Sequence, residues 1–323
     1  MRINEVIYGL SLDIIKSFPD KSINCVITSP PYWQLRDYGY PEQWGLEPTY
    51  QEYLEHLWSL MDEIWRVLKD DGTVWVNLGD SYSHSGHGSW SKYDNGDISH
   101  KDKYYGDGRN ASPVTDWSNT KEKPKCQLLI PHRFAIGCID RGWIVRNDII
   151  WAKRNGMPES VTDRFSKKHE YFFFMVKQPK YYFDLDGVRD NHISNMVRDR
   201  NKTFKKMKEI GQTNCSQDKL GVTQIGSPLG KNPGDVSDFW DVPTQPSSEK
   251  HYATYNFDLI DKPIIAGCPE GGVILDPFAG TGTTILRAID LKRKGIGIEG
   301  NKEYCEIFNK RFHERYGMFK EII

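Results

Sequence analysis

The feature that most constrains the fold of this chain is a buried-strand pattern that stops on two prolines. The run Ile23–Thr28 is largely apolar and rich in β-branched residues, and Ser29-Pro30-Pro31-Tyr32 follows it directly. Two consecutive prolines restrict the backbone and remove two N–H donors, which leaves carbonyls that point outward without a local partner. Because open α/β sheets bind ligands at the carboxyl ends of their strands, this rigid cluster of acceptors and its tyrosine suit a planar ring that carries an amine.

A second strand and turn lie near the opposite end of the sequence. Residues 272–284 read as a strand, a glycine turn and a helix that we expect to run from Thr283 to about Lys292. The next predicted strand, residues 295–298, is followed by Glu299, 17 residues after Gly282, and an acidic residue near this spacing typically holds ribose hydroxyls. The turn lacks the third glycine of a dinucleotide site and the Lys-Ser/Thr pair of a phosphate loop, so NAD and ATP are disfavoured.

These two motifs resemble those of the amino-methylating DNA methyltransferases, which modify an exocyclic nitrogen of a base. Asp276-Pro-Phe-Ala-Gly-Thr-Gly-Thr-Thr284 is similar to their cofactor motif. Thr28-Ser-Pro-Pro-Tyr-Trp33 is similar to their catalytic motif, in the form associated with cytosine N4 methylation. The catalytic motif comes first, which is the order of the permuted class called beta. The resemblance implies an α/β fold with a Rossmann-like, seven-stranded mixed sheet and a small inserted target-recognition region.

The same resemblance implies the catalytic residues Ser29, Pro30, Pro31 and Tyr32. The Pro30 carbonyl and the Ser29 side chain would orient the target amine, and Tyr32 would stack on a base flipped out of the duplex. Asp80 follows the strand predicted at residues 73–78 and is a candidate proton acceptor or partner of Ser29, and the alternative is a turn residue. Adenine N6 methylation remains the nearest alternative reaction. A catalytically silent DNA-binding protein is an alternative of another class.

The resemblance also implies S-adenosyl-L-methionine as the cofactor. Glu299 would accept hydrogen bonds from the ribose hydroxyls, the glycine turn would face the methionine part, and Asp276 would organise the turn. Phe278 is either a cofactor contact or a core residue. The predicted cofactor-binding residues are Thr28, Tyr255, Asp276, Phe278, Gly280, Thr281, Gly282, Thr283 and Glu299.

A basic segment separates the two motifs. Residues 188–231 contain nine Lys or Arg residues against four Asp or Glu residues, in a chain whose formal net charge is −1. In the permuted class the recognition region lies in this gap, so we expect the segment to contact double-stranded DNA with a specific target sequence; a solvated basic surface is the alternative. The predicted DNA-binding residues are Trp33, Arg36, Lys153, Arg189, Arg198, Arg200, Lys202, Lys205 and Lys206.

The pattern divides the chain into a catalytic half at residues 1–186, a target-recognition region at 187–249 and a cofactor-binding half at 250–323. Helices are predicted at 49–69, where Gly72 would mark the stop, and at 128–139. Residues 82–125 hold only Ile98 and Val114 among Ile, Leu and Val, so we expect a long mobile loop. Seven strands are predicted, with the pair at 143–151 and 171–176 closing one edge of the sheet. The other five are at residues 5–8, 23–28 and 73–78, before Asp276 and before Glu299.

Composition limits the kinds of site that the protein can carry and the compartment in which we expect it. The six cysteines include no Cys-x-x-Cys pair and the histidines lack partners at ligand spacing, so we expect no metal site and no disulfide framework. The scattered cysteines fit a reducing cytoplasm. No stretch approaches the roughly 20 apolar residues of a membrane helix, so we expect a soluble protein. The sequence leaves open whether the protein forms a homodimer, which DNA site it recognises, and whether a restriction endonuclease acts on the same site.

Overall fold

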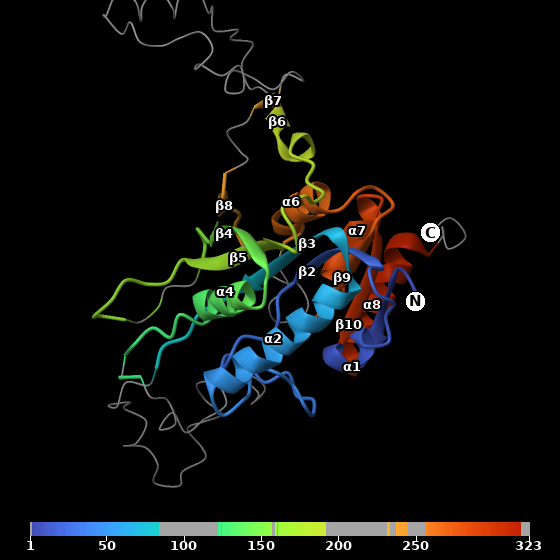
Figure 1. Cartoon of the computed structure of the whole chain (residues 1–323). Helices are drawn as coiled ribbons and strands as arrows, with labels where there is room; N and C mark the ends of the chain where they lie inside the picture. The colour runs from blue at the N-terminus through green and yellow to red at the C-terminus, as the bar shows by residue number, and fades with distance from the viewer. Residues whose placement is uncertain are drawn as a thin grey trace, which may run out of the picture. The chain divides into compact units, whose positions relative to one another are not determined.

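A mixed sheet of eight strands forms the centre of the larger of two units in the computed structural model (Figure 1). The structure describes residues 2–83, 122–123, 125–156, 159, 161–191, 231–232, 237–244 and 256–317. The larger unit comprises Met1–Phe183 and Asp238–Ile323, and the smaller unit comprises Asp184–Ser237. Most of the loop predicted at residues 82–125 lies outside the described residues.

Five parallel strands make one side of the sheet. In spatial order they are β1 (Glu5–Tyr8), β10 (Lys294–Glu299), β9 (Val273–Asp276), β2 (Ile23–Thr28) and β3 (Leu68–Leu78). β5 (His169–Val176) pairs antiparallel with β3, and β4 (Ile144–Ala152) pairs antiparallel with β5. All seven predicted strands are therefore present in one mixed sheet, which confirms the predicted fold class.

An eighth strand corrects the predicted edge of the sheet. β8 (Phe239–Asp241) pairs in parallel with β4 on the side away from β5, so the β4–β5 pair is not the edge. Trp240 in β8 is buried and packs against Trp75 and Phe172, with ring centroids 6.3 and 5.6 Å apart. A run of three residues is too short to show the alternation of apolar and polar side chains that marks a strand in a sequence. The burial of Trp240 stabilises the pairing of β8 with β4.

The two motifs meet in the middle of the sheet, although they are far apart in sequence. β2 pairs in parallel with β9, with Cys25 opposite Ile274 and Val26 opposite Leu275. Parallel neighbours end at the same side of a sheet, so the residues that follow β2 and β9 face one crevice. The order of the strands thus places the Ser-Pro-Pro-Tyr motif next to the glycine turn.

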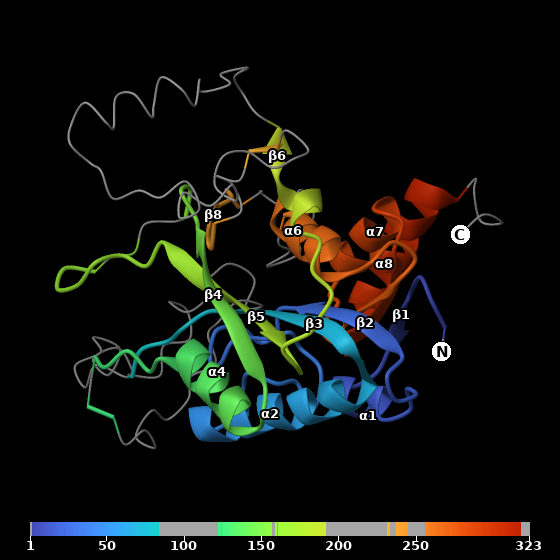
Figure 2. The same cartoon turned by 45° about the horizontal axis from the view of Figure 1, so that its top comes forward.

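Helices cover both faces of the sheet (Figure 2). Three of them, α1 (Ser11–Ile15), α2 (Tyr50–Val67) and α4 (Ile130–Asp140), lie on one face, where they bury alternate strand residues such as Val26, Val74 and Val76. On the other face α6 (Phe257–Gly267) covers the intervening residues Cys25, Ile27 and Trp75. α7 (Thr283–Asp290) and α8 (Lys302–Tyr316) lie on the same side as α6.

The boundary between α2 and β3 differs from the prediction. The expected apolar stripe of α2 is buried, but the helix ends at Val67 and the strand begins at Leu68, without a stop at Gly72. The pairing with β2 shifts between Ile23 and Cys25, so Gly72 lies in an irregular stretch of the strand. A Cβ on Gly72 would lie 2.9 Å from the carbonyl oxygen of Asn24, so this glycine permits close strand approach instead of ending a helix.

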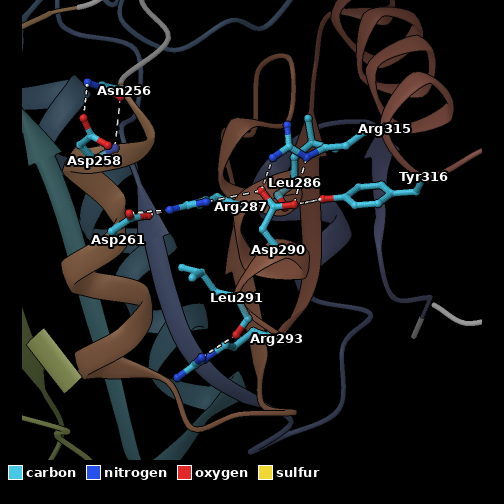
Figure 3. Close-up of polar contacts among 10 residues, drawn as sticks. All are labelled: Asn256, Asp258, Asp261, Leu286, Arg287, Asp290, Leu291, Arg293, Arg315 and Tyr316. Carbon is cyan, nitrogen blue, oxygen red and sulfur yellow. Dashed lines mark hydrogen bonds and ion pairs between the residues drawn. The ribbon is translucent and has the colours of Figure 1, made fainter. Parts of the chain in front are cut away.

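Ion pairs tie together the three helices on the cofactor-motif side (Figure 3). Arg287 of α7 donates two hydrogen bonds of 2.6 Å to the Asp261 carboxylate of α6. Asp290, also in α7, accepts bonds of 3.0 and 2.6 Å from Arg315 and one of 2.7 Å from the Tyr316 hydroxyl, both in α8. These bidentate pairs fix the helices around the turn that follows β9.

In the smaller unit the described residues form a short 3₁₀ turn, η4 (Asp186–Val188), and an antiparallel pair of β6 (Asp190–Asn191) and β7 (Lys231–Asn232). Most of the basic segment predicted to bind DNA lies outside the described residues. β8 falls within the predicted recognition region at 187–249 but belongs to the large sheet.

Candidate active site

The Ser-Pro-Pro-Tyr motif lies at the carboxyl end of β2, next to the end of β3. The Ser29 hydroxyl donates a 3.2 Å hydrogen bond to Oδ1 of Asn77, and Nδ2 of Asn77 donates to the backbone carbonyl of Tyr171 at 3.0 Å. The bond to Tyr171 orients the Asn77 amide so that its oxygen faces Ser29. Because Ser29 uses its proton on Asn77, the lone pairs of Oγ remain able to accept hydrogen bonds from a ligand.

Tyr32 is positioned at both ends of its side chain. Its hydroxyl donates to Oε2 of Glu170 at 2.8 Å and lies 2.8 Å from Oδ1 of Asn77. Burial, followed by the Glu170 carboxylate, raises the pKa of Tyr32 well above its ordinary value, so the hydroxyl stays protonated. A Cβ on Gly79 would lie 2.5 Å from Cε2 of Tyr32, so the ring rests directly on backbone that only glycine leaves uncovered.

The two proline carbonyls have different surroundings. The carbonyl of Pro31 accepts a 2.8 Å hydrogen bond from the Tyr53 hydroxyl of α2. In the described part of the chain no group donates a hydrogen bond to the carbonyl of Pro30. Of the two carbonyls, that of Pro30 is therefore the one left without a donor from the described residues.

Asp80 has a full set of local partners. Its carboxylate accepts hydrogen bonds from the side chain of Gln127 (2.7 Å) and from the backbone N–H groups of Ser81 (2.9 Å), Leu129 (3.2 Å) and Ile130 (2.9 Å). The last two groups lie at the N-terminus of α4, where a negative charge is stabilising. This geometry supports the structural alternative for Asp80, since its carboxylate caps a turn and a helix.

Asp276 joins the two motifs. Oδ1 of its buried carboxylate accepts a 2.8 Å bond from the Thr28 hydroxyl at the end of β2 and a 3.1 Å bond from the backbone N–H of Phe278. Oδ2 accepts a 2.6 Å bond from the Thr284 hydroxyl in the first turn of α7. Thr28 is itself buried, so its predicted cofactor role reduces to holding Asp276 and the turn in place.

The glycine turn is open on one side and closed on the other. Gly280 and Gly282 both have left-handed backbone, with φ of 53° and 78°. A Cβ on Gly280 would meet nothing within 4 Å, whereas one on Gly282 would lie 2.1 Å from Phe308 of α8. Gly282 is therefore required for packing, while Gly280 leaves backbone that a ligand can approach.

Glu299 lies at the end of β10, beside this turn. Its carboxylate accepts hydrogen bonds from the backbone N–H groups of Gly280 (2.8 Å) and Asn301 (2.7 Å) and is 7% exposed. Burial raises the pKa of Glu299 to about 7, against the lowering effect of these N–H groups. A buried carboxyl that titrates near neutral pH is typical of a functional site.

A pocket of ≈ 180 Å³ lies beside the start of the turn that follows β9. Its walls include Gly9 and Leu10 after β1, Phe278 after β9 and Gly300 after β10, together with Trp44 from the loop that follows Tyr32. The Trp44 ring is 5.4 Å from that of Phe278, at an angle of 56°. Phe278 also packs against the core, so both of its predicted roles are compatible with its position.

Two other predicted cofactor residues face α8. The Arg311 guanidinium donates to the carbonyl and the hydroxyl of Thr281, at 2.8 and 2.7 Å, and to the hydroxyl of Thr283 at 3.3 Å. Their side chains thus hold the turn from outside the pocket. Tyr255 lies outside the described residues.

The residues predicted to bind DNA fall into three groups. The structure contradicts the prediction for Trp33, because its side chain packs into the core. The indole is 2% exposed and donates to the Glu47 carbonyl at 2.9 Å.

Among the predicted basic residues, Arg36 is half-buried beside Tyr38, and Lys153 contacts the Glu170 carboxylate. In the smaller unit Arg189 forms a 3.2 Å ion pair with Asp186. Outside the described residues lie Arg198, Arg200, Lys202, Lys205 and Lys206.

Sequence reasoning missed three residues of this site. Asn77 is the one polar side chain in the buried run 74–78, and a polar residue at a strand end is a signal that could have been read. Glu170 gives a similar signal, because it is a charged residue just before the apolar run 172–176. Trp44 carries no comparable signal, because only the folded loop brings it to Phe278.

The described residues contain no group of three or more His, Cys, Asp or Glu side chains placed to hold a metal ion. Nor do the described helices include one with the length and apolar character needed to cross a bilayer.

Comparison with known proteins relates this site to a family. The family model described as DNA methylase matches residues 23–310. The type II methyltransferase M.Cfr9I of Citrobacter freundii is 35% identical over 302 residues, covering 93% of this chain and 84% of its own. The corresponding enzyme M.SmaI of Serratia marcescens is 33% identical over 315 residues, covering 98% of this chain and 92% of its own.

Solved structures share the fold. The PvuII DNA methyltransferase, named as cytosine-N4-specific, aligns with a TM-score of 0.61 at 18% identity, over 95% of this chain and 85% of its own. A protein of Thermus thermophilus, named as a DNA modification methylase, aligns with a TM-score of 0.56 at 19% identity, over 97% of this chain and 95% of its own. The family model and the two type II methyltransferases each match most of the length of this chain. The chain therefore belongs to the DNA methylase family and is a DNA methyltransferase.

Proposed function

We propose that this enzyme transfers a methyl group from S-adenosyl-L-methionine to the exocyclic N4 of a cytosine flipped out of double-stranded DNA. The observation that carries the proposal is the pair of acceptors at the end of β2. The Ser29 hydroxyl donates a hydrogen bond to Oδ1 of Asn77, and the Pro30 carbonyl lacks a donor among the described residues. A primary amine has two N–H bonds, so these two oxygens can orient it.

The pocket beside the glycine turn fits the cofactor. Gly280 leaves room for close approach of a ligand to the backbone, Phe278 and Trp44 supply aromatic walls, and Gly300 places the pocket beside Glu299. Glu299 would hold the ribose hydroxyls. When bound, S-adenosyl-L-methionine supplies an activated methyl group together with its own leaving group. The related Thermus thermophilus protein was solved with this compound bound.

The residues of the motif act by positioning. The N4 lone pair of cytosine is conjugated into the ring, so the nitrogen must become more tetrahedral as the methyl group arrives. Hydrogen bonds from the amine to Ser29 and Pro30 favour that geometry, and the protonated Tyr32 offers a fixed ring on which the base can stack. As the new N–C bond forms, the bond between the methyl group and its leaving group breaks. The nitrogen then loses one proton to water or to a nearby acceptor.

The same proposal assigns roles to the domains and implies a partner enzyme. Residues 1–186 and 250–323, together with β8, would form the catalytic domain, and the rest of residues 187–249 would recognise the target DNA. The relatives are named type II methyltransferases, which supports a cognate restriction endonuclease that acts on the same site in the cytoplasm.

The decisive experiment is to express the enzyme in a host that lacks DNA methylation and to sequence the genomic DNA with a method that separates N4-methylcytosine from N6-methyladenine. N4-methylcytosine at one sequence motif is the expected result, and it identifies the target site. N6-methyladenine would overturn the proposed base but keep the cofactor and the site. Unmodified DNA would contradict the proposed reaction, and a failure to bind S-adenosyl-L-methionine in calorimetry would point to a silent DNA-binding protein.

A further inference from the structure

A phenylalanine of the larger unit is almost fully exposed. Phe165, in the loop between β4 and β5, is 97% exposed, the highest value among the exposed large hydrophobic residues in the described ranges. Leaving a phenylalanine in water forgoes about 1.5–3 kcal/mol of burial. A cost of this size on one residue suggests that Phe165 has a partner outside the folded chain.

The residues around Phe165 are held in place. Arg164 donates to the Glu159 carboxylate at 2.6 Å and to the carbonyl of Phe165 at 3.1 Å, and its guanidinium lies 4.1 Å from the centre of the Tyr82 ring. Lys167 donates to the backbone carbonyl of Asp80. These contacts fix the backbone on both sides of Phe165, so its ring is presented to solvent from a supported position.

The charge of this loop suits a polyanion. Residues 153–168 include five Lys or Arg residues and two acidic residues, in a chain of net charge −1. Some of these cations are paired, as in the contacts of Arg154 with Asp241 and of Arg164 with Glu159. The loop nevertheless keeps an excess of positive charge around one exposed apolar ring, and basic residues flanking such a ring are typical of proteins that bind and deform DNA.

The loop also begins and ends at the active site. Lys153 follows the last residue of β4, and Glu170 is the second residue of β5. These two side chains contact each other, and Glu170 accepts the hydrogen bond of Tyr32. A duplex that brings its target base to Tyr32 would therefore pass close to the β4–β5 loop.

We propose that Phe165 inserts into the DNA duplex next to the target base and replaces the stacking that is lost when the base leaves the helix. This inference rests on the proposed DNA base methylation and adds the residue that favours the extrahelical base. Base flipping costs unpairing and unstacking energy, and the cost is least for a base that is already mismatched. An apolar side chain placed between base steps offsets part of this cost.

The test compares the binding of wild type, Phe165→Ala and Phe165→Trp to two duplexes that carry the site found by sequencing. In one duplex the target cytosine is paired, and in the other it faces a mismatched base. We expect Phe165→Ala to weaken binding to the paired duplex at least tenfold and to the mismatched duplex less than threefold. Phe165→Trp should retain wild-type binding to both. Because Phe165 is exposed, neither variant should alter folding.

The matched control is Ile139→Ala, which removes an exposed apolar side chain (52%) from the last turn of α4. Ile139 lies nine residues, or about 14 Å, from the end of α4 that contacts Asp80, and its loss should leave both affinities unchanged. An equal loss of affinity for both duplexes on Phe165→Ala, or no loss for either, would overturn the insertion. Failure of the wild type to methylate DNA would instead contradict the proposed function.

Discussion

The hydroxyl of Tyr32 lies 2.8 Å from Oε2 of Glu170, a residue 138 positions later in the chain. This contact connects the Ser-Pro-Pro-Tyr motif to β5, which pairs with β3 and so flanks the end of β2. Lys153, the residue after β4, contacts the same carboxylate. The orientation of Tyr32 therefore depends on three strands, and Glu170 is a positioning residue in this arrangement.

We expect Glu170→Gln and Tyr32→Phe each to lower kcat about tenfold. Tyr32→Phe removes the hydrogen bond, and Glu170→Gln leaves an acceptor but removes the charge that strengthens the bond. The affinity for S-adenosyl-L-methionine, measured by calorimetry, should stay within about twofold, because Glu299 and the glycine turn are untouched. In the double variant the loss should be close to that of either single variant. Two independent, additive losses would show that the hydrogen bond has no role in catalysis.

Gly79→Ala should act on catalysis through Tyr32. The added Cβ would lie 2.5 Å from Cε2 of the tyrosine ring, so the ring must move away from its position over the backbone. We expect kcat to fall at least tenfold, with a loss of stability of about 1–3 kcal/mol in denaturant unfolding. Ser29 and Pro30 remain in this variant, so wild-type turnover would mean that the ring position is unimportant.

Glu299 should make cofactor binding depend on pH. Its pKa of about 7 means that the carboxyl is protonated in acid and becomes a full acceptor for ribose hydroxyls only as the pH rises through 7. Affinity for S-adenosyl-L-methionine should therefore increase from pH 6 to pH 8 in the wild type. Glu299→Gln has no titrating group there and is the control, so the same pH dependence in this variant would refute the assignment.

The same carboxyl should affect the stability of the free enzyme in the opposite direction. Its folded-state pKa lies above the ordinary value of 4.5, so the folded chain binds the proton more tightly than the unfolded chain. The stabilising effect is complete below pH 4.5 and is lost as the pH rises through 7, by up to about 3 kcal/mol. The melting temperature of Glu299→Gln minus that of the wild type should increase from pH 5 to pH 8, and a constant difference would contradict this.

The ion pairs of Figure 3 should matter for stability alone. Removing the bidentate pair by Arg287→Met should destabilise the fold by about 1–3 kcal/mol, because the half-buried Asp261 carboxylate loses both hydrogen bonds. Lys310→Met breaks an exposed pair with Glu314, 3.9 Å long, and should leave the unfolding midpoint unchanged. Equal effects of the two substitutions would show that the buried pair contributes no more than the exposed one.

Local patterns in the sequence were sufficient for most of the architecture. The β-branched run before Ser29, the apolar stripe of α2 and the turn at Gly280 and Gly282 each carry their own physical signal, through alternation, helical periodicity and left-handed backbone. The two motifs and their order predicted the family. The same signals failed for β8 and for the junction at Leu68, where tertiary packing outweighs local preference.

The sequence by itself thus determined the carboxyl ends of the central strands and the order of the two motifs, and it predicted the roles of Ser29, Pro30 and Glu299. Only the tertiary structure decided which polar groups complete the site, because Asn77, Tyr171 and Glu170 reach the motif through strand pairing that no local pattern records. It also showed that Trp33 is a core residue and that Asp80 caps α4. The physical reason is that hydrogen-bond partners and burial are set by contacts between residues distant in sequence, while periodicity and turn chemistry are set by neighbours.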